Sequence, residues 1–271
     1  KAFYDCCSLT SVTIPDSVTE IGSYAFHYCY SLTEFKGKFA DGDGRILVVD
    51  GELIAFAQAG ITEYTIPDSV TSIGYEAFSD CDSLTSVTIP DSVTSIGYKA
   101  FGYCDSLTSV TIPDSVTSIE DYAFNHCDSL TSVTIGDSVT SIGDYAFYSC
   151  DSLKKVYCYA TIPPSLSRDV FYGNASGRRI YVYEECVELY KSAWSGYKDS
   201  IYTNGKNCPD TTTIEYTTSD GNTITSSKLP IISNNYENGV GTLIVVGKKI
   251  THIPDSAFYN CSKNSTLTLP S

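Results

Sequence analysis

The chain has 271 residues, with 17 Lys and Arg against 32 Asp and Glu, giving a formal net charge of −15 at pH 7. Phosphates repel an acidic surface, which argues against nucleic acid and bare anionic membranes as partners. No apolar run approaches the roughly 18 residues that a membrane helix needs. Hydrophobic residues make up 42% of the chain, enough to build a core, and the eleven cysteines are the unusual feature.

A repeat of 23 residues dominates the first half of the chain. The segment that begins at Cys81 recurs at Cys104 and Cys127, and in part at Cys150. Within each unit a Ser-Val-Thr-Ile run alternates polar and apolar residues, as in a half-buried strand, and a turn follows it. One unit cannot bury its own apolar edge, whereas stacked units share a continuous core. The period and spacing predict a β-rich α+β solenoid, a right-handed leucine-rich-repeat array.

This array is expected over residues 1–157, with one interruption. The chain begins inside a unit, at Lys1, so we expect a trimmed terminus, and the lack of a signal peptide says nothing about secretion. Residues 36–62 leave the period, and two apolar runs there flank Asp50-Gly51, a hairpin signal. Because the segment is apolar, we expect a β-hairpin island that continues the sheet. A protruding binding loop is the alternative.

Residues 158–204 have a different character, with proline and glycine loops followed by an amphipathic pattern. This pattern predicts a helix over about 184–195. An open solenoid end needs a cap, so the segment is predicted to be a C-terminal capping segment with Trp194 in its core.

Residues 205–271 combine a hairpin signal at 219–222 with a return of the repeat at 250–261. They are predicted to form a hairpin linker and the start of a second repeat array. An extended cap that packs on the first array is the alternative.

The unit S-L-T-S-V-T-I-P-D-S-V-T-S-I-G-x-x-A-F resembles the BspA-type leucine-rich repeat, which is common in surface and secreted proteins of Bacteroidetes and related bacteria. The resemblance covers about residues 1–157 and resumes near 240–271. It implies an extracellular or cell-surface location and adhesion to host matrix proteins, host cells or other bacteria. The family defines no catalytic residues, so the resemblance assigns none to this chain.

Six cysteines share one repeat position, so the array should stack them in a column with a spacing of about 4.8 Å. A straight column does not converge on a tetrahedral metal centre, and its parallel Cβ vectors are poor for disulfides. We therefore expect buried thiols that pack as small hydrophobes. A local disulfide among Cys158, Cys186 and Cys208 is a further alternative. The six are Cys6, Cys29, Cys81, Cys104, Cys127 and Cys150.

No catalytic residue and no metal ligand is predicted. Catalysis needs a nucleophile held by a base, and His126, beside Cys127, occupies a variable position typical of a solvent-facing loop. Single carboxylates about 4.8 Å apart are too sparse for a calcium ion, so the acidic ladder that follows the strands is expected to form turns. This ladder consists of Asp16, Asp68, Asp91, Asp114 and Asp137.

Two ladders of hydroxyl side chains form the predicted binding surface. They point away from the buried Val and Ile of each strand and give a flat, nearly uncharged concave face. Thr is also simply a good strand former, which is the competing explanation. The residues are Ser11, Thr13, Thr65, Ser86, Thr88, Ser109, Thr111, Ser132 and Thr134.

An aromatic rim near the Phe corners is the second candidate surface. Tyrosine is favoured in interfaces because it gives contact area at low entropy cost, and it would suit stacking on sugar rings. A partly buried packing role is the alternative. The rim consists of Tyr24, Tyr75, Tyr98, Tyr122 and Tyr145.

The sequence therefore predicts a non-enzymatic adhesion module, without a cofactor, that binds host or bacterial surface proteins through an extended solenoid face. A glycan-binding module that uses the aromatic rim is one alternative. A structural spacer that displays other domains is another. No nucleic acid partner and no direct membrane insertion is expected.

Overall fold

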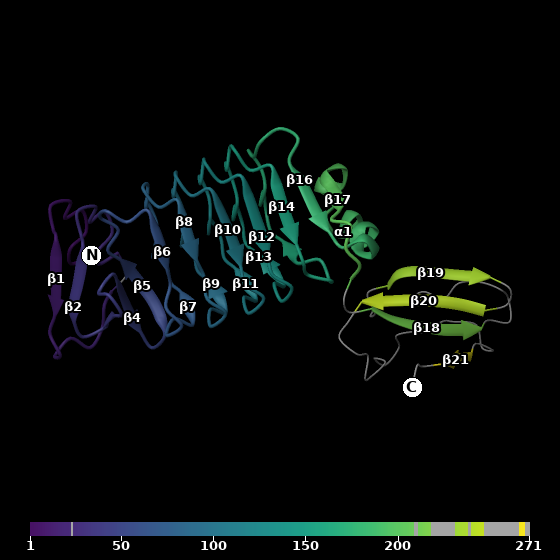
Figure 1. Cartoon of the computed structure of the whole chain (residues 1–271), viewed down its shortest axis with the longest axis horizontal. Helices are drawn as coiled ribbons and strands as arrows, with labels where there is room; N and C mark the ends of the chain where they lie inside the picture. The colour runs from purple at the N-terminus through teal and green to yellow at the C-terminus, as the bar shows by residue number, and fades with distance from the viewer. Residues whose placement is uncertain (23, 209–210, 218–230, 238–239, 247–265, 269–271) are drawn as a thin grey trace. The chain divides into compact units, whose positions relative to one another are not determined.

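The computed structural model describes residues 1–22, 24–208, 211–217, 231–237, 240–246 and 266–268. They divide into two compact units, Lys1–Ala160 with Pro164–Ile180, and Thr161–Pro163 with Tyr181–Ser271. The first unit is a solenoid of short stacked strands (Figure 1). The predicted solenoid is thereby confirmed.

The first sheet of the solenoid takes one strand from each repeat. Equivalent repeat positions lie opposite one another, as Ser109 does with Ser132 and Val110 with Val133. The 23-residue period therefore corresponds to one parallel strand per unit. In order, the strands are β6 (Glu63–Thr65), β8 (Ser86–Thr88), β10 (Ser109–Ile112), β12 (Ser132–Ile135) and β14 (Lys155–Cys158).

A second sheet is built from two-residue parallel strands, also one per repeat. Each of these strands contributes a serine that is half-buried or exposed, followed by an apolar residue that faces the interior. The strands are β7 (Ser72–Ile73), β9 (Ser95–Ile96), β11 (Ser118–Ile119), β13 (Ser141–Ile142) and β15 (Ser165–Leu166).

The hairpin island extends this second sheet. Strands β4 (Ile46–Val49) and β5 (Glu52–Phe56) pair antiparallel around the predicted turn, and β3 (Ala40–Asp41) pairs with β4. Strand β5 then pairs in parallel with β7, with Leu53 opposite Ile73. The hairpin therefore continues the sheet, as its apolar character predicted.

The interior of the solenoid is filled by ladders of identical side chains. Five phenylalanine rings stack with centroids 4.9 to 5.5 Å apart and planes within 14° of parallel. Rings at this spacing add a specific stacking term to the burial of apolar area. The ladder consists of Phe78, Phe101, Phe124, Phe147 and Phe171.

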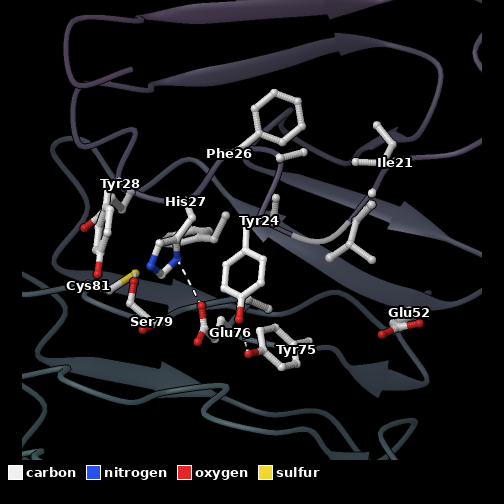
Figure 2. A pocket seen from close by; sticks show the side chains of 17 residues that line it. Ile21, Tyr24, Phe26, His27, Tyr28, Glu52, Tyr75, Glu76, Ser79 and Cys81 are labelled. Carbon is white, nitrogen blue, oxygen red and sulfur yellow. Dashed lines mark hydrogen bonds and ion pairs between the residues drawn. The ribbon is translucent and has the colours of Figure 1, made fainter. Parts of the chain in front are cut away.

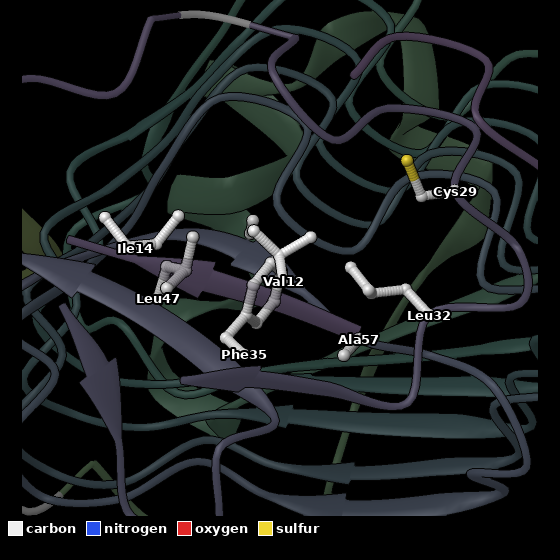
Figure 3. Close-up of a cluster of buried hydrophobic side chains, with 8 residues drawn as sticks. Val12, Ile14, Cys29, Leu32, Phe35, Leu47 and Ala57 are labelled. Atoms are coloured by element: carbon white, nitrogen blue, oxygen red, sulfur yellow. The ribbon is translucent and has the colours of Figure 1, made fainter. Parts of the chain in front are cut away.

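The N-terminal end has a small apolar cluster (Figure 3). It gathers Val12, Leu32, Phe35 and Leu47 under β1 (Ser11–Ile14) and β2 (Glu34–Gly37). These two strands are 23 residues apart and pair in parallel, but they form a two-stranded sheet of their own. The island thus separates the first units from the regular array.

The second unit contains α1 (Val187–Ala193), which lies between 3-10 turns at Glu184–Cys186 and Ser195–Ser200. Trp194 is 3% exposed and its ring meets that of Tyr190 edge-on at 4.8 Å. Strand β16 (Arg179–Val182) spans the boundary between the two units, and β17 (Ile201–Thr203) follows the turns. Among the described residues, no helix is long and apolar enough to cross a membrane.

A four-stranded antiparallel sheet completes the second unit, in the order β19-β20-β18-β21. The hairpin expected at 219–222 and the repeat expected at 250–261 lie outside the described residues, so the second array stays a prediction. The strands are β18 (Thr211–Thr217), β19 (Ile231–Glu237), β20 (Val240–Val246) and β21 (Thr266–Thr268).

Candidate binding surfaces

The hydroxyl ladders lie on the outer side of the first sheet. Successive residues of a strand point to opposite faces, so Val87 and Val110 are buried while Thr88 and Thr111 are exposed. The structure joins seven of the predicted residues on this one sheet, which we call the hydroxyl face. They are Thr65, Ser86, Thr88, Ser109, Thr111, Ser132 and Thr134.

The other two predicted residues are placed elsewhere. Ser11 and Thr13 are exposed on β1, where they lie opposite Glu34 and Lys36 of β2. Because the hairpin island interrupts the first sheet, these two residues do not belong to the hydroxyl face. The sequence marks the interruption, because Thr13 and Thr65 are 52 residues apart, which is not a multiple of 23, but it does not show that the two strands join different sheets.

Charged and aromatic residues border the hydroxyl face in the terminal units. Glu63 lies opposite Ser86 at one end. At the other end Lys155 lies opposite Ser132, and Tyr157 takes the threonine position. Glu63 takes the serine position of the unit that holds Thr65, and the alignment reaches Lys155 and Tyr157 when it is extended by one unit past Thr134. The predicted ladders omit all three residues.

A shallow groove of about 570 Å³ runs along the hydroxyl face. Thr88, Thr111 and Thr134 line it together with the carboxylates of Asp91 and Asp114. The Asp137 backbone N–H donates to Asp114 Oδ1 at 2.9 Å, so Asp114 supports the turn of the next unit. Asp91 and Asp114 also give the groove a negative charge.

The five rim tyrosines form one continuous column, although they come from two different repeat positions. Tyr24, Tyr122 and Tyr145 stand two residues before the Phe of their unit, and Tyr75 and Tyr98 stand three before it. Consecutive ring centroids are 5.1, 4.9, 5.6 and 5.0 Å apart. We call this arrangement the tyrosine column.

Cations of the chain itself cover the two ends of the tyrosine column. The Lys1 ammonium lies 4.8 Å from the ring centroid of Tyr24, and the Arg168 guanidinium lies 5.1 Å from that of Tyr145. Within the column the planes of Tyr75 and Tyr98 are 10° apart. One face of each of these rings therefore meets another ring or a cation, which reduces the aromatic face left for a ligand.

The cysteine column packs against backbone of the preceding unit. Cys104, Cys127 and Cys150 are fully buried. Each of their thiols donates to the carbonyl oxygen of the Phe 26 residues earlier, at 3.1 Å. Burial raises the pKa of Cys81 and Cys127 well above the ordinary thiol value, as expected for inert packing residues.

No disulfide links the cysteines that the structure describes. The bond considered among Cys158, Cys186 and Cys208 is therefore not formed there, and all three side chains are buried. The described residues also contain no group of three His, Cys, Asp or Glu placed to hold a metal ion.

His126 has an aromatic environment. Its ring stacks on Tyr103 with centroids 4.8 Å apart and planes 9° apart, and it meets Tyr148 edge-on. The neighbouring Cys127 thiol is directed to a backbone carbonyl in the core. This geometry does not place a base against a nucleophile.

A family model described as "BspA type Leucine rich repeat region" matches the chain in six copies, over residues 1–39, 53–178 and 230–271. The unmatched stretch between the first two segments falls within the hairpin island. A comparison with curated proteins finds no match.

The comparison with solved structures finds similar proteins, of which the first two share the fold over most of this chain. The pneumococcal vaccine antigen PcpA is 21% identical over 73% of this chain and 55% of its own, with a TM-score of 0.56. A leucine-rich repeat protein from Eubacterium ventriosum is 24% identical over 65% of this chain and 48% of its own, with a TM-score of 0.55. A leucine-rich cell surface protein from Faecalibacterium prausnitzii is 26% identical over 56% and 48%, with a TM-score of 0.43. The chain spans about half the length of these structures.

Proposed function

Because the chain belongs to the BspA-type leucine-rich-repeat family, we propose that it is a non-enzymatic, protein-binding module of a cell-surface or secreted protein. The observation that carries this proposal is the hydroxyl face, where strand after strand presents Ser and Thr in register. Solenoids characteristically use such extended surfaces to bind partners.

The chemistry of the hydroxyl face suits a protein partner. Each hydroxyl both donates and accepts a hydrogen bond, so the face can pair with backbone and polar side chains. The strands hold these groups in a fixed array, which limits the entropy lost on binding. Asp91 and Asp114 add negative charge along the groove, which favours a partner with basic residues at that edge. We propose host or bacterial surface proteins of the extracellular-matrix type.

The tyrosine column gives less support to glycan binding. A sugar ring stacks on the face of an aromatic ring, and here Tyr75 stacks on Tyr98 and Tyr122 stacks on Tyr145, so each of these rings has one face covered by its neighbour. The column therefore acts as a packed border that stiffens the array, and the hydroxyl face is the better supported surface.

A binding screen tests this proposal. The purified chain is applied at concentrations up to about 100 µM, where weak protein contacts are still detectable, to a panel of matrix glycoproteins before and after enzymatic deglycosylation. The same chain is applied to a glycan array. We expect binding to at least one protein that survives deglycosylation. Binding to glycans alone would favour a glycan-binding module, and no binding at all would favour a structural spacer.

A further inference from the structure

A cavity lies inside the first unit, where the hairpin island places Phe56 against Phe78, with ring centroids 4.7 Å apart, at the end of the phenylalanine ladder. Phe78 stacks on Phe101 at 4.9 Å, whereas Phe26 stacks on Phe3 and meets Phe35 edge-on. The cavity between the two stacks has a volume of about 220 Å³ (Figure 2). We call it the break pocket. This volume is below the usual range for small-molecule sites and suits a group of side-chain size.

Regular neighbouring units are joined by backbone hydrogen bonds, whereas side chains connect the two sides of the break pocket. In a regular pair of units, Phe78 N donates to Ala100 O at 2.7 Å. Across the break pocket the hydroxyl groups of Tyr24 and Tyr75 share a hydrogen bond, and His27 Nδ1 lies 3.3 Å from Glu76 Oε2 (Figure 2). The pocket is therefore framed by rings and by a carboxylate.

Glu76 is a buried carboxylate with one oxygen that accepts no hydrogen bond. Its side chain is 8% exposed, and Oε2 accepts no hydrogen bond. The Lys99 ammonium is 3.8 Å from the other oxygen, Oε1. Burial raises the pKa of Glu76 and lowers that of His27, so the imidazole does not supply a positive charge at neutral pH. A buried carboxylate in this state is costly unless a donor, preferably a cation, reaches it.

The wall beside the break pocket already holds an ammonium group. The Lys1 Nζ atom lies 4.7 Å from the ring centroid of Tyr4 and 4.8 Å from that of Tyr24, and Tyr24 also lines the pocket. Aromatic faces attract ammonium groups through the ring quadrupole. The pocket also has an apolar part, formed by Phe26, Phe56 and Ala77.

We propose that the break pocket binds a primary alkyl-ammonium group of the kind that a lysine side chain carries. The ammonium donates to Glu76 Oε2, and the alkyl stem lies against Phe26 and Phe56. Binding of the ammonium itself is independent of the hydroxyl face. Its delivery by a lysine of a protein partner rests on the proposed function.

An NMR titration with Nα-acetyl-L-lysine methylamide tests the proposal. We expect saturable shifts of the backbone amides of Ala77 and Ser79. The same probe acetylated on Nε carries no charge and is expected to cause no saturable shift. Glu76→Gln is expected to weaken binding at least about tenfold, because a hydrogen bond to a charged group is worth more than one to a neutral group.

Two further variants sharpen the test. Glu63→Gln makes the same change of charge at an exposed glutamate of β6 and is expected to leave binding unchanged. Lys99→Gln removes the ammonium nearest to Glu76 and is expected to tighten binding, which keeps the test decisive if Glu76→Gln does not fold.

Four results would overturn the proposal: equal binding of the Nε-acetylated probe, unchanged binding by Glu76→Gln, no saturable shift up to about 20 mM probe, or saturable binding of methyl glucoside instead. Any of these would leave the screen of the hydroxyl face unaffected, because that screen measures binding to whole proteins.

Discussion

Glu76, Lys99 and Tyr122 occupy the same repeat position and share a left-handed backbone, with φ of 51°, 50° and 59°. Such a conformation costs a residue with a Cβ atom about 1–2 kcal/mol. Each backbone N–H here donates to a carbonyl of the following unit, at 2.8 to 3.0 Å. The stack therefore holds the backbone in place and leaves the side chain free to vary, so that one position supplies a buried acid, a cation and a column tyrosine.

His27, which lies next to Glu76, has a pKa below the ordinary histidine value. Its side chain is 8% exposed and faces Glu76 and Asp80, with the ammonium groups of Lys99 and Lys1 also acting on it. Burial is the main cause of its lowered pKa. Below about pH 6.5, the ordinary histidine value, the unfolded chain takes up a proton that the folded chain does not. Stability contributed by neutral His27 is therefore lost as the pH falls through this window.

We expect His27→Gln to reduce this acid-side loss of stability. Urea unfolding at several pH values between 7.5 and 5, a range chosen to bracket the free histidine pKa of about 6.5, measures the effect. His126→Gln is the matched control for the loss of a histidine elsewhere in the array. Equal pH slopes for the wild-type protein and His27→Gln would contradict the prediction. Glu76 has a raised pKa and contributes a slope of opposite sign, present in both proteins.

Among the elements, the short turn segment that carries the phenylalanine of each unit makes the clearest contribution to the stability of the solenoid. Phe124 is fully buried between Phe101 and Phe147, with ring centroids at 5.0 and 5.2 Å. Solenoid stability depends on the interfaces between neighbouring units. A cavity at this point weakens two interfaces at once.

Phe124→Ala is expected to lower the free energy of unfolding by about 3–5 kcal/mol, the usual cost of truncating a buried Phe. Phe3→Ala is the matched control. Phe3 lies at the end of the chain's first repeat, is 37% exposed, and stacks on the ring of Phe26. Its cost should be about 1 kcal/mol or less. Urea unfolding of both variants checks this, and equal costs would mean that the ladder does not carry the stability assigned to it.

For the whole molecule, the repeat made most of the fold predictable. A 23-residue period with alternating strands leads directly to the stacked first sheet, and Asp50-Gly51 marks the hairpin between β4 and β5. The column of cysteines follows from the period as well. The apolar character of the hairpin predicted that it continues a sheet, but not that it joins the second sheet, because that pairing depends on contacts between β5 and β7.

The hydroxyl face was predictable only where the repeat is regular. Seven hydroxyl residues share one sheet because their units stack without interruption, whereas Ser11 and Thr13 lie beyond the island. The five rim tyrosines were predicted together from their place near the Phe of each unit, and the reach of their side chains joins two repeat positions into one column. The break pocket lies where Phe56 of the island, and not the Phe of a repeat, meets Phe78, and no sequence motif marks this junction.

Binding of a matrix protein identified in the screen, measured by surface plasmon resonance, tests the role of the hydroxyl face most directly. The test variant carries Thr88→Lys, Thr111→Lys and Thr134→Lys, and the matched control carries Thr94→Lys, Thr117→Lys and Thr140→Lys at exposed positions just before strands of the second sheet. Both make the same change of charge, and both should keep the far-UV circular dichroism spectrum of the wild-type protein. We expect the hydroxyl-face variant to bind at least about tenfold more weakly and the control to bind as the wild-type protein does. Unchanged binding by the hydroxyl-face variant, or an equal loss in both, would contradict the account.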